Sequence, residues 1–459
     1  MARTRARSRC ASCGFATTLP LGRCPECGAW DSFEPEAPAP APGGGAGASP
    51  AAPARPVGEL TAAPTPRLLT GIGELDRVLG GGVVPGAVVL LGGDPGVGKS
   101  TLLLHALDAL ARAGHRVLYA SAEESAEQTA LRARRLGVAA PGLMVLCEGR
   151  LQAVLAEADR LGPRVLAVDS VQVMAAADVP SAPGTPTQVR AVAAALTAYA
   201  KPRGLAVVLV GHVTKDGGLA GPKTLEHLVD AVLHFEGDPR SACRILRASK
   251  NRFGCTDEIG VFEMGAAGLR EVADPSALFL AERPRGAPGS AVVASLEGAR
   301  PLLVEVQALT AHAAGPPRRT ALGIDPYRVA LMLAVLERHA GLDAGQLDVF
   351  VNVAGGLTLD EPAVDLALVA ALASAATGRP VPAEIACFGE VGLAGEIRAV
   401  PRVDLRLAEA ARRGFRRAVV PPGGAAAAPG LELVRVADVG AALTALLGPA
   451  PARVARGSG

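Results

Sequence analysis

The chain has 459 residues, of which 49% are hydrophobic, so it is long enough for two or three domains with their own cores. No run of about eighteen uncharged apolar residues occurs, which excludes a membrane-spanning helix. The 46 Lys and Arg residues nearly balance the 44 Asp and Glu residues, so net charge does not indicate a polyanionic partner.

Lysine is rare in this chain. Codon bias toward Ala, Gly, Pro and Arg explains the rarity, and under such bias a retained lysine points to a need for an ammonium rather than a guanidinium. The five lysines are Lys99, Lys201, Lys215, Lys223 and Lys250.

The first 36 residues contain half of the eight cysteines. Two C-x2-C pairs lie ten residues apart, a spacing that predicts a tetrahedral, structural zinc site. A redox pair, the alternative, would not need a second copy nearby. The basic N-terminus is not followed by the apolar stretch of a secretory signal, so we expect a cytoplasmic protein. The predicted zinc ligands are Cys10, Cys13, Cys24 and Cys27.

Residues 37–66 are rich in Ala, Pro and Gly and almost lack large apolar side chains, so we expect a disordered linker. From residue 67 to about 273, apolar runs alternate with helical segments, which predicts an α/β domain with a mainly parallel sheet. Further strands are expected at the edge between residues 260 and 273. The predicted strands are Val88–Leu91, Arg116–Ala120, Val165–Val168 and Leu205–Val210.

A complete G-x4-G-K-[ST] motif follows the first of these strands and leads into a helical segment. Its backbone N–H groups are suited to cradle phosphates, its lysine to reach the terminal phosphates, and its serine to hold magnesium. The motif therefore predicts an ATP site formed by Gly93, Asp94, Pro95, Gly96, Val97, Gly98, Lys99, Ser100 and Thr101.

Polar residues at the ends of the other strands complete the predicted site. Asp169 ends a buried strand, where a carboxylate can organise magnesium together with Ser100. Glu123 follows another strand and is our choice for the residue that aligns the attacking water, with Glu124 as the alternative. His212 ends a fourth strand, where it can sense the γ-phosphate.

Four segments resemble the RadA (Sms) family of bacterial DNA repair proteins, which are relatives of RecA: the four-cysteine knuckle and residues 70–82, 210–217 and 250–254, the last reading Lys-Asn-Arg-Phe-Gly. The resemblance implies a RecA-like ATPase core, a ring of six subunits with nucleotide at the interfaces, binding of single-stranded and branched DNA, and RecA recombinase as a partner.

The resemblance also implies DNA-facing loops at residues 174–188 and 213–223, of which the second carries Lys215 and Lys223. A basic run then extends from Arg240 to Arg252. Within it, Lys250 and Arg252 either complete the neighbouring subunit's ATP site or contact the DNA backbone.

Residues 274–447 resemble the peptidase domain of Lon, and residues 448–459 are expected to form a flexible tail. The resemblance places Ala363 where Lon has its nucleophilic serine and Asp404 near its general-base lysine, and no lysine follows Lys250. A Ser–Lys pair is therefore impossible here, which argues against an ATP-dependent protease. We expect a proteolytically inactive scaffold for the ring that also helps to grip DNA.

Together these features predict a DNA-dependent ATPase of recombinational repair that binds ATP, Mg²⁺ and Zn²⁺ and drives branch migration. The alternative is a RecA-like protein that forms filaments and exchanges strands without motor activity.

Overall fold

The computed structural model describes residues 8–10, 16–17, 22–25, 27–30, 33–35, 66–211, 225–237, 242–423 and 428–449. The chain divides into two compact units, Met1–Pro64 and Thr65–Gly459. Within the described ranges, no helix combines the length and the apolar character that crossing a bilayer requires.

The N-terminal unit contains a small antiparallel sheet in the order β2-β1-β3. Cys10, the last residue of β1, lies opposite Phe33 of β3. Strands this short bury too little apolar surface to be stable alone, so a metal cross-link suits them. The strands are β1 (Ser8–Cys10), β2 (Ala16–Thr17) and β3 (Phe33–Pro35).

The larger unit begins with a nine-stranded sheet in the order β12-β11-β10-β9-β4-β8-β7-β5-β6. Strands β4 to β9 pair with one another in parallel, and β10, β11 and β12 add an antiparallel edge next to β9. The strands are β4 (Val88–Gly93), β5 (Val117–Ser121), β6 (Leu143–Cys147), β7 (Val165–Asp169), β8 (Ala206–Val210), β9 (Ala231–Glu236), β10 (Cys243–Asn251), β11 (Ile259–Gly265) and β12 (Gly268–Glu271).

The four strands predicted from apolar runs are β4, β5, β7 and β8, and nearly all their residues are buried, as a sheet covered on both faces requires. The expected edge strands are β11 and β12. Most of the basic run proves to be strand β10, in which Arg244 and Arg247 are interspersed among buried apolar residues. The α/β fold with a mainly parallel sheet is therefore confirmed.

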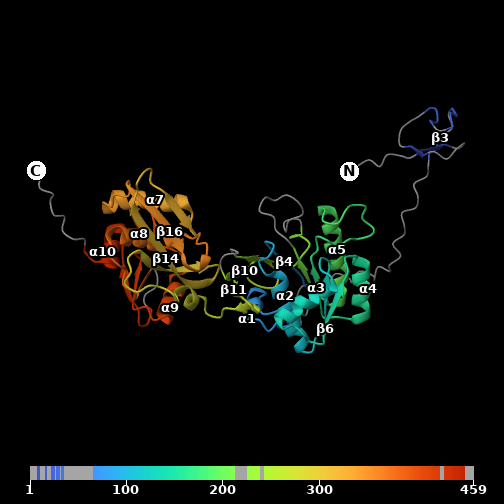
Figure 1. Ribbon diagram of the computed structural model, residues 1–459, viewed down its shortest axis with the longest axis horizontal. Helices are drawn as coiled ribbons and strands as arrows, with labels where there is room; N and C mark the ends of the chain where they lie inside the picture. The colour runs from blue at the N-terminus through green and yellow to red at the C-terminus, as the bar shows by residue number, and fades with distance from the viewer. Residues whose placement is uncertain are drawn as a thin grey trace, which may run out of the picture. The chain divides into compact units, whose positions relative to one another are not determined.

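Helices cover both faces of this sheet (Figure 1). The apolar sides of α1 (Gly73–Val78), α2 (Lys99–Arg112) and α3 (Ala126–Leu136) pack on one face. Those of α4 (Leu151–Leu161) and α5 (Pro186–Arg203) pack on the other.

The C-terminal region has a seven-stranded mixed sheet in the order β15-β16-β14-β13-β17-β20-β21. Its strands are β13 (Ser290–Glu297), β14 (Arg300–His312), β15 (Arg319–Leu322), β16 (Leu347–Val353), β17 (Ile385–Cys387), β20 (Arg417–Val420) and β21 (Glu432–Arg435), and a separate hairpin pairs β18 (Glu390–Val391) with β19 (Ile397–Arg398).

Helix α8 is apolar on all sides because it is buried between the strands β13 and β14 and the helices α7 and α10 (Figure 1). Helices α6 and α9 also pack on β14. The helices are α6 (Pro275–Leu280), α7 (Pro326–Ala340), α8 (Asp365–Thr377), α9 (Val403–Arg412) and α10 (Val439–Leu447), with 3-10 turns η3 (Ala354–Gly356) and η4 (Pro362–Val364).

The turn between β13 and β14 joins the C-terminal region to the ATPase core. Arg300 forms an ion pair with the buried Glu74 of α1, and Arg247 of β10 pairs with Glu297 at 2.7 Å. One apolar cluster also continues from β10 and β11 into β13 and β14. The boundary after residue 273 stays a prediction, and both charged and apolar contacts cross it.

Candidate functional site

The phosphate-binding loop connects the end of β4 to the start of α2. Its path requires glycine at two positions. A Cβ on Gly93 would lie 2.4 Å from the carbonyl oxygen of Phe235, and Gly98 has a φ of 115° with Met264 only 2.8 Å from a would-be Cβ. The chain therefore turns tightly in front of the N-terminus of α2, where backbone N–H groups and the helix dipole favour phosphate.

Lys99 is the charged centre of this loop. It is 4% exposed, and its ammonium donates hydrogen bonds to the carbonyl oxygens of Gly93 at 2.7 Å and Asp94 at 2.9 Å. Burial lowers the pKa of Lys99, while the negative charges of Asp169, Asp94 and Glu123 act to raise it. The ammonium thus lies where the three carboxylates act together, with acceptors that a phosphate can replace.

Asp169 ends β7 directly beside Ser121, the last residue of β5. It is buried, and its Oδ2 accepts a 2.7 Å hydrogen bond from the hydroxyl of Tyr119. Ser100 is the second residue of α2. A carboxylate and a hydroxyl beside a phosphate cradle are oxygen donors of the kind that Mg²⁺ prefers, so these residues fit magnesium.

The two glutamates after β5 have different partners. Glu123 accepts a hydrogen bond from the hydroxyl of Ser170, the residue after Asp169. Glu124 instead forms an ion pair with Arg132 of α3. The ion pair holds Glu124 toward α3, whereas Glu123 lies within electrostatic reach of Lys99. This geometry favours Glu123 over Glu124 as the residue that aligns water.

The first loop expected to face DNA is held by one buried side chain. Gln188 of α5 accepts a hydrogen bond from the N–H of Ala176 at 3.1 Å and donates one to the carbonyl of Ser181 at 2.9 Å. Its partners lie between Ala176 and Ser181, so this glutamine, which was not singled out from the sequence, ties the first half of the loop to the start of α5.

The other predicted DNA loop is outside the described residues. His212, Lys215 and Lys223 all fall in the stretch 212–224, so their assignments remain predictions.

Lys250 lies away from the strand ends that carry the phosphate-binding loop, toward the ends where the parallel strands begin. It pairs with Val232, which pairs with Leu90 of β4, three residues or about 10 Å before Gly93. Its ammonium donates to the carbonyl oxygens of Glu226 at 2.5 Å and Val229 at 2.8 Å, both before β9. Lys250 therefore points away from the phosphate-binding loop.

The neighbours of Lys250 in the pentapeptide connect it to α1. The side-chain amide of Asn251 donates to the carbonyl of Val78, and Arg252 pairs with Asp230 at 3.2 Å. Arg67 donates to the carbonyl oxygens of Leu79 and Phe253. Two of the segments that carry the family resemblance thus pack on each other.

Two other arginines of the basic run have roles within the subunit. Arg244 is buried and donates from Nε to the carbonyl of Val97 at 3.2 Å. Because Val97 belongs to the phosphate-binding loop, this hydrogen bond helps to hold the loop in place. Arg247 pairs with Glu236 and Glu297. Sequence alone did not separate these two arginines from Lys250 and Arg252, because the register of β10 decides which way each side chain points.

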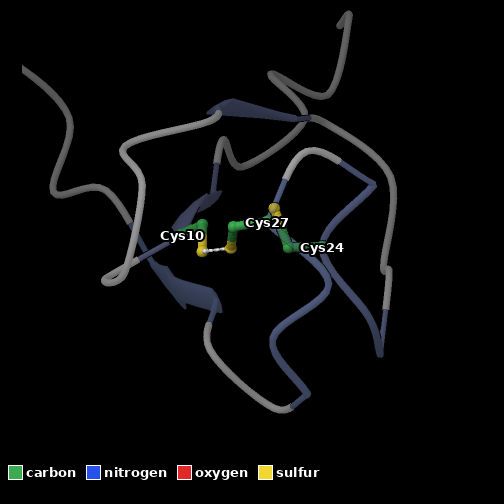
Figure 2. Close-up of side chains that lie close together, drawn as sticks. All are labelled: Cys10, Cys24 and Cys27. Atoms are coloured by element: carbon green, nitrogen blue, oxygen red, sulfur yellow. Dashed lines mark hydrogen bonds between the residues drawn. The ribbon is translucent and has the colours of Figure 1, made fainter.

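Three of the four predicted zinc ligands lie together (Figure 2). The thiol sulfurs of Cys10, Cys24 and Cys27 lie within 4.8 Å of one another, and those of Cys10 and Cys27 are 3.7 Å apart. Cys13 is outside the described residues. Three converging sulfurs fit a thiolate site for zinc.

In the Lon-like region a buried arginine pairs with a glutamate, each two residues along the chain from a position compared with the Lon nucleophile or base. Ala363 and Arg406 are buried, and the Arg406 guanidinium binds both oxygens of the Glu361 carboxylate, at 2.8 and 2.6 Å. Arg406 also donates to the carbonyl oxygens of Ala294 and Pro401. Its donors are thus directed at internal acceptors, and the serine and lysine of a peptidase are both missing.

Three family models match the chain. The rubredoxin metal binding domain matches residues 9–35, an AAA domain matches residues 53–218, and the C-terminal proteolytic domain of the Lon (S16) protease matches residues 338–427. The predicted resemblances to a zinc knuckle and to Lon are thereby confirmed.

Whole-chain relatives agree with the family models. The chain is 46% identical over 458 residues to the DNA repair protein RadA of Bacillus subtilis, covering 98% of this chain and all of that protein. It is 48% identical over 455 residues to RadA of Pseudomonas aeruginosa, covering 97% and 100%, and 49% identical over 440 residues to RadA of Brucella abortus, covering 92% and 93%.

Proposed function

Because the chain belongs to the RadA family of DNA repair proteins, we propose that it is a DNA-dependent ATPase that binds single-stranded DNA as a hexameric ring and drives branch migration of recombination intermediates. The observation that carries the proposal is the buried ammonium of Lys99 in the phosphate-binding loop, which lies within electrostatic reach of Asp94, Glu123 and Asp169. An AAA domain with this constellation is equipped to bind and cleave ATP.

In this proposal each residue of the site has one task. The backbone of the loop and the N-terminus of α2 bind the phosphates, and Lys99 exchanges its carbonyl acceptors for the terminal phosphates. Ser100 and Asp169 would hold magnesium, which supplies positive charge to the phosphoryl group when bound. Glu123 orients the attacking water, and His212 transmits the phosphate state to the loop that follows β8.

The position of Lys250 and Arg252 supports an assembly of several subunits. Neither side chain is directed at the phosphate-binding loop of its own chain, and Arg252 is more than half exposed, so a neighbour's nucleotide or DNA can compete for the acceptors that these cations now contact. Both contact the residues that follow the predicted loop carrying Lys215 and Lys223. Either role couples DNA binding to hydrolysis, with RecA recombinase as the protein partner.

The test is the ATPase rate of the full chain with and without single-stranded DNA, together with its mass in solution with and without nucleotide. We expect DNA to raise the rate and the mass to equal six subunits. Electron micrographs with open filaments, or turnover that DNA does not change, would reject the motor and favour a strand-exchange filament.

A further inference from the structure

Two buried hydroxyl groups contact the two carboxylates of the ATP site. We propose that Tyr119 and Ser170 are positioning residues with separate tasks: Tyr119 orients Asp169 toward magnesium, and Ser170 orients Glu123 toward the attacking water. The inference rests on the proposed ATPase function. It adds two residues that lie outside the phosphate-binding motif and that were not among the predicted site residues.

Tyr119 is the only residue of β5 with a large polar side chain, and it lies in an apolar core with aliphatic residues and the aromatic Phe235 and Phe262. It is 1% exposed and pairs in register with Ala167, two residues before Asp169, so its side chain and that of Asp169 project from the same face. Its hydroxyl donates to Oδ2 of Asp169 at 2.7 Å.

A phenylalanine would fill the same space without burying a polar group, so packing alone does not explain the hydroxyl. A carboxylate oxygen can only accept, so in the 2.7 Å contact the Tyr119 hydroxyl is the donor. The hydrogen bond from Tyr119 therefore holds Oδ2 of Asp169 in place. It also sets the orientation of the whole carboxylate, and so the direction in which Oδ1 points.

Ser170 holds the second carboxylate. It is fully buried, and its hydroxyl donates to Oε1 of Glu123. The backbone strengthens the link, because the N–H of Ala122 donates to the carbonyl oxygen of Asp169 at 2.8 Å. The ends of β5 and β7 are thus joined twice, and Glu123 is fixed beside Asp169.

The two hydroxyls predict two different defects. Loss of the Tyr119 hydroxyl frees the metal carboxylate to rotate, so it weakens the response to Mg²⁺. Loss of the Ser170 hydroxyl frees the water-aligning carboxylate, so it slows the chemical step and leaves metal binding as it was. A purely structural role for either residue would not separate these readouts.

The experiment measures binding of a fluorescent ATP analogue to the full chain across a Mg²⁺ titration and in EDTA, together with turnover. For Tyr119→Phe we expect the Mg²⁺ concentration at half-maximal binding to rise about tenfold, binding in EDTA to be unchanged, and turnover to recover at high Mg²⁺. For Ser170→Ala we expect turnover to fall about tenfold with an unchanged Mg²⁺ midpoint.

Tyr199→Phe is the matched control, because Tyr199 also donates its hydroxyl to an aspartate, Asp159 at 2.6 Å. Tyr199 lies near the end of α5, just before β8 begins, whereas the ATP site lies where β4, β5 and β7 end. It should match the wild type in every readout. Melting temperatures close to the wild type would show that all three variants are folded.

An unchanged Mg²⁺ midpoint in Tyr119→Phe, or an equal loss of binding in EDTA, would overturn the role of Tyr119. A shifted midpoint in Ser170→Ala, or unchanged turnover, would overturn that of Ser170. If the wild type binds the analogue with Mg²⁺ but never hydrolyses ATP, the proposed function fails, while the Mg²⁺ titration still decides the role of Tyr119.

Discussion

The phosphate-binding loop and the Lon-like region both bury a cation, but with opposite consequences. Lys99 rests on backbone carbonyls of its own loop, with carboxylates nearby that are held by hydroxyls. Arg406 is fully buried and makes a two-pronged ion pair with Glu361. The first cation can exchange its acceptors for a ligand, whereas the second is satisfied within the protein. The groups that a buried cation contacts, rather than its burial, therefore distinguish a ligand-binding site from a structural ion pair.

The largest effect should follow from removing the exchangeable cation. In Lys99→Ala, and also in Lys99→Arg, we expect ATP turnover to fall at least about a hundredfold, because alanine removes the buried ammonium and a planar guanidinium does not reproduce its compact charge. Steady-state phosphate release measures the effect. Lys201→Ala is the control, since Lys201 is a half-exposed lysine paired with Asp230. Normal turnover in Lys99→Ala would refute the assignment of the ATP site.

The internal cation should instead support stability. Arg406→Met should lower the free energy of unfolding by about 3 to 5 kcal/mol, because it leaves the Glu361 carboxylate without its cation. Denaturant unfolding measures this change. The double variant Arg406→Met, Glu361→Leu should regain part of the loss, since no charge is then left unpaired.

Arg417→Met is the matched control in the same region, because the Arg417–Glu432 pair is exposed and should contribute no more than about 1 kcal/mol. Equal losses of stability in Arg406→Met and Arg417→Met would show that the buried pair is not special.

The comparison can be sharpened at Lys250, whose ammonium also rests on backbone carbonyls but away from its own ATP site. Lys250→Ala should leave nucleotide binding intact and reduce DNA-stimulated hydrolysis about tenfold, in line with the loss of one charge-stabilising contact. Rates with and without single-stranded DNA measure this. DNA stimulation equal to that of the wild type would assign Lys250 to the fold alone.

The smallest effect on turnover should come from the zinc knuckle. Replacing Cys24 and Cys27 by Ser should release about one zinc per chain and leave basal ATPase activity close to the wild type, since the knuckle belongs to a separate unit. Metal analysis of the purified protein measures the zinc. Unchanged zinc content would show that the four-cysteine assignment is wrong.

Much of the architecture was predictable because it is encoded locally. Apolar runs identified β4, β5, β7 and β8, and the phosphate-binding motif lies between β4 and α2 as predicted. The basic run was harder to interpret. Its residues belong mainly to β10, where pairing with β9 and β11 directs Arg244 inward and Lys250 toward the residues before β9.

The sequence by itself determined the chemistry that is available: a phosphate-binding loop, matched cysteine pairs, and no serine–lysine pair in the Lon-like region. These properties depend on residue type and short spacing. Only the tertiary structure decided which charged side chains are paired inside the protein and which remain able to bind a ligand. Tyr119 and Asp169 are 50 residues apart in the sequence, and Glu361 and Arg406 are 45 residues apart. Strand register and helix packing bring each pair into contact.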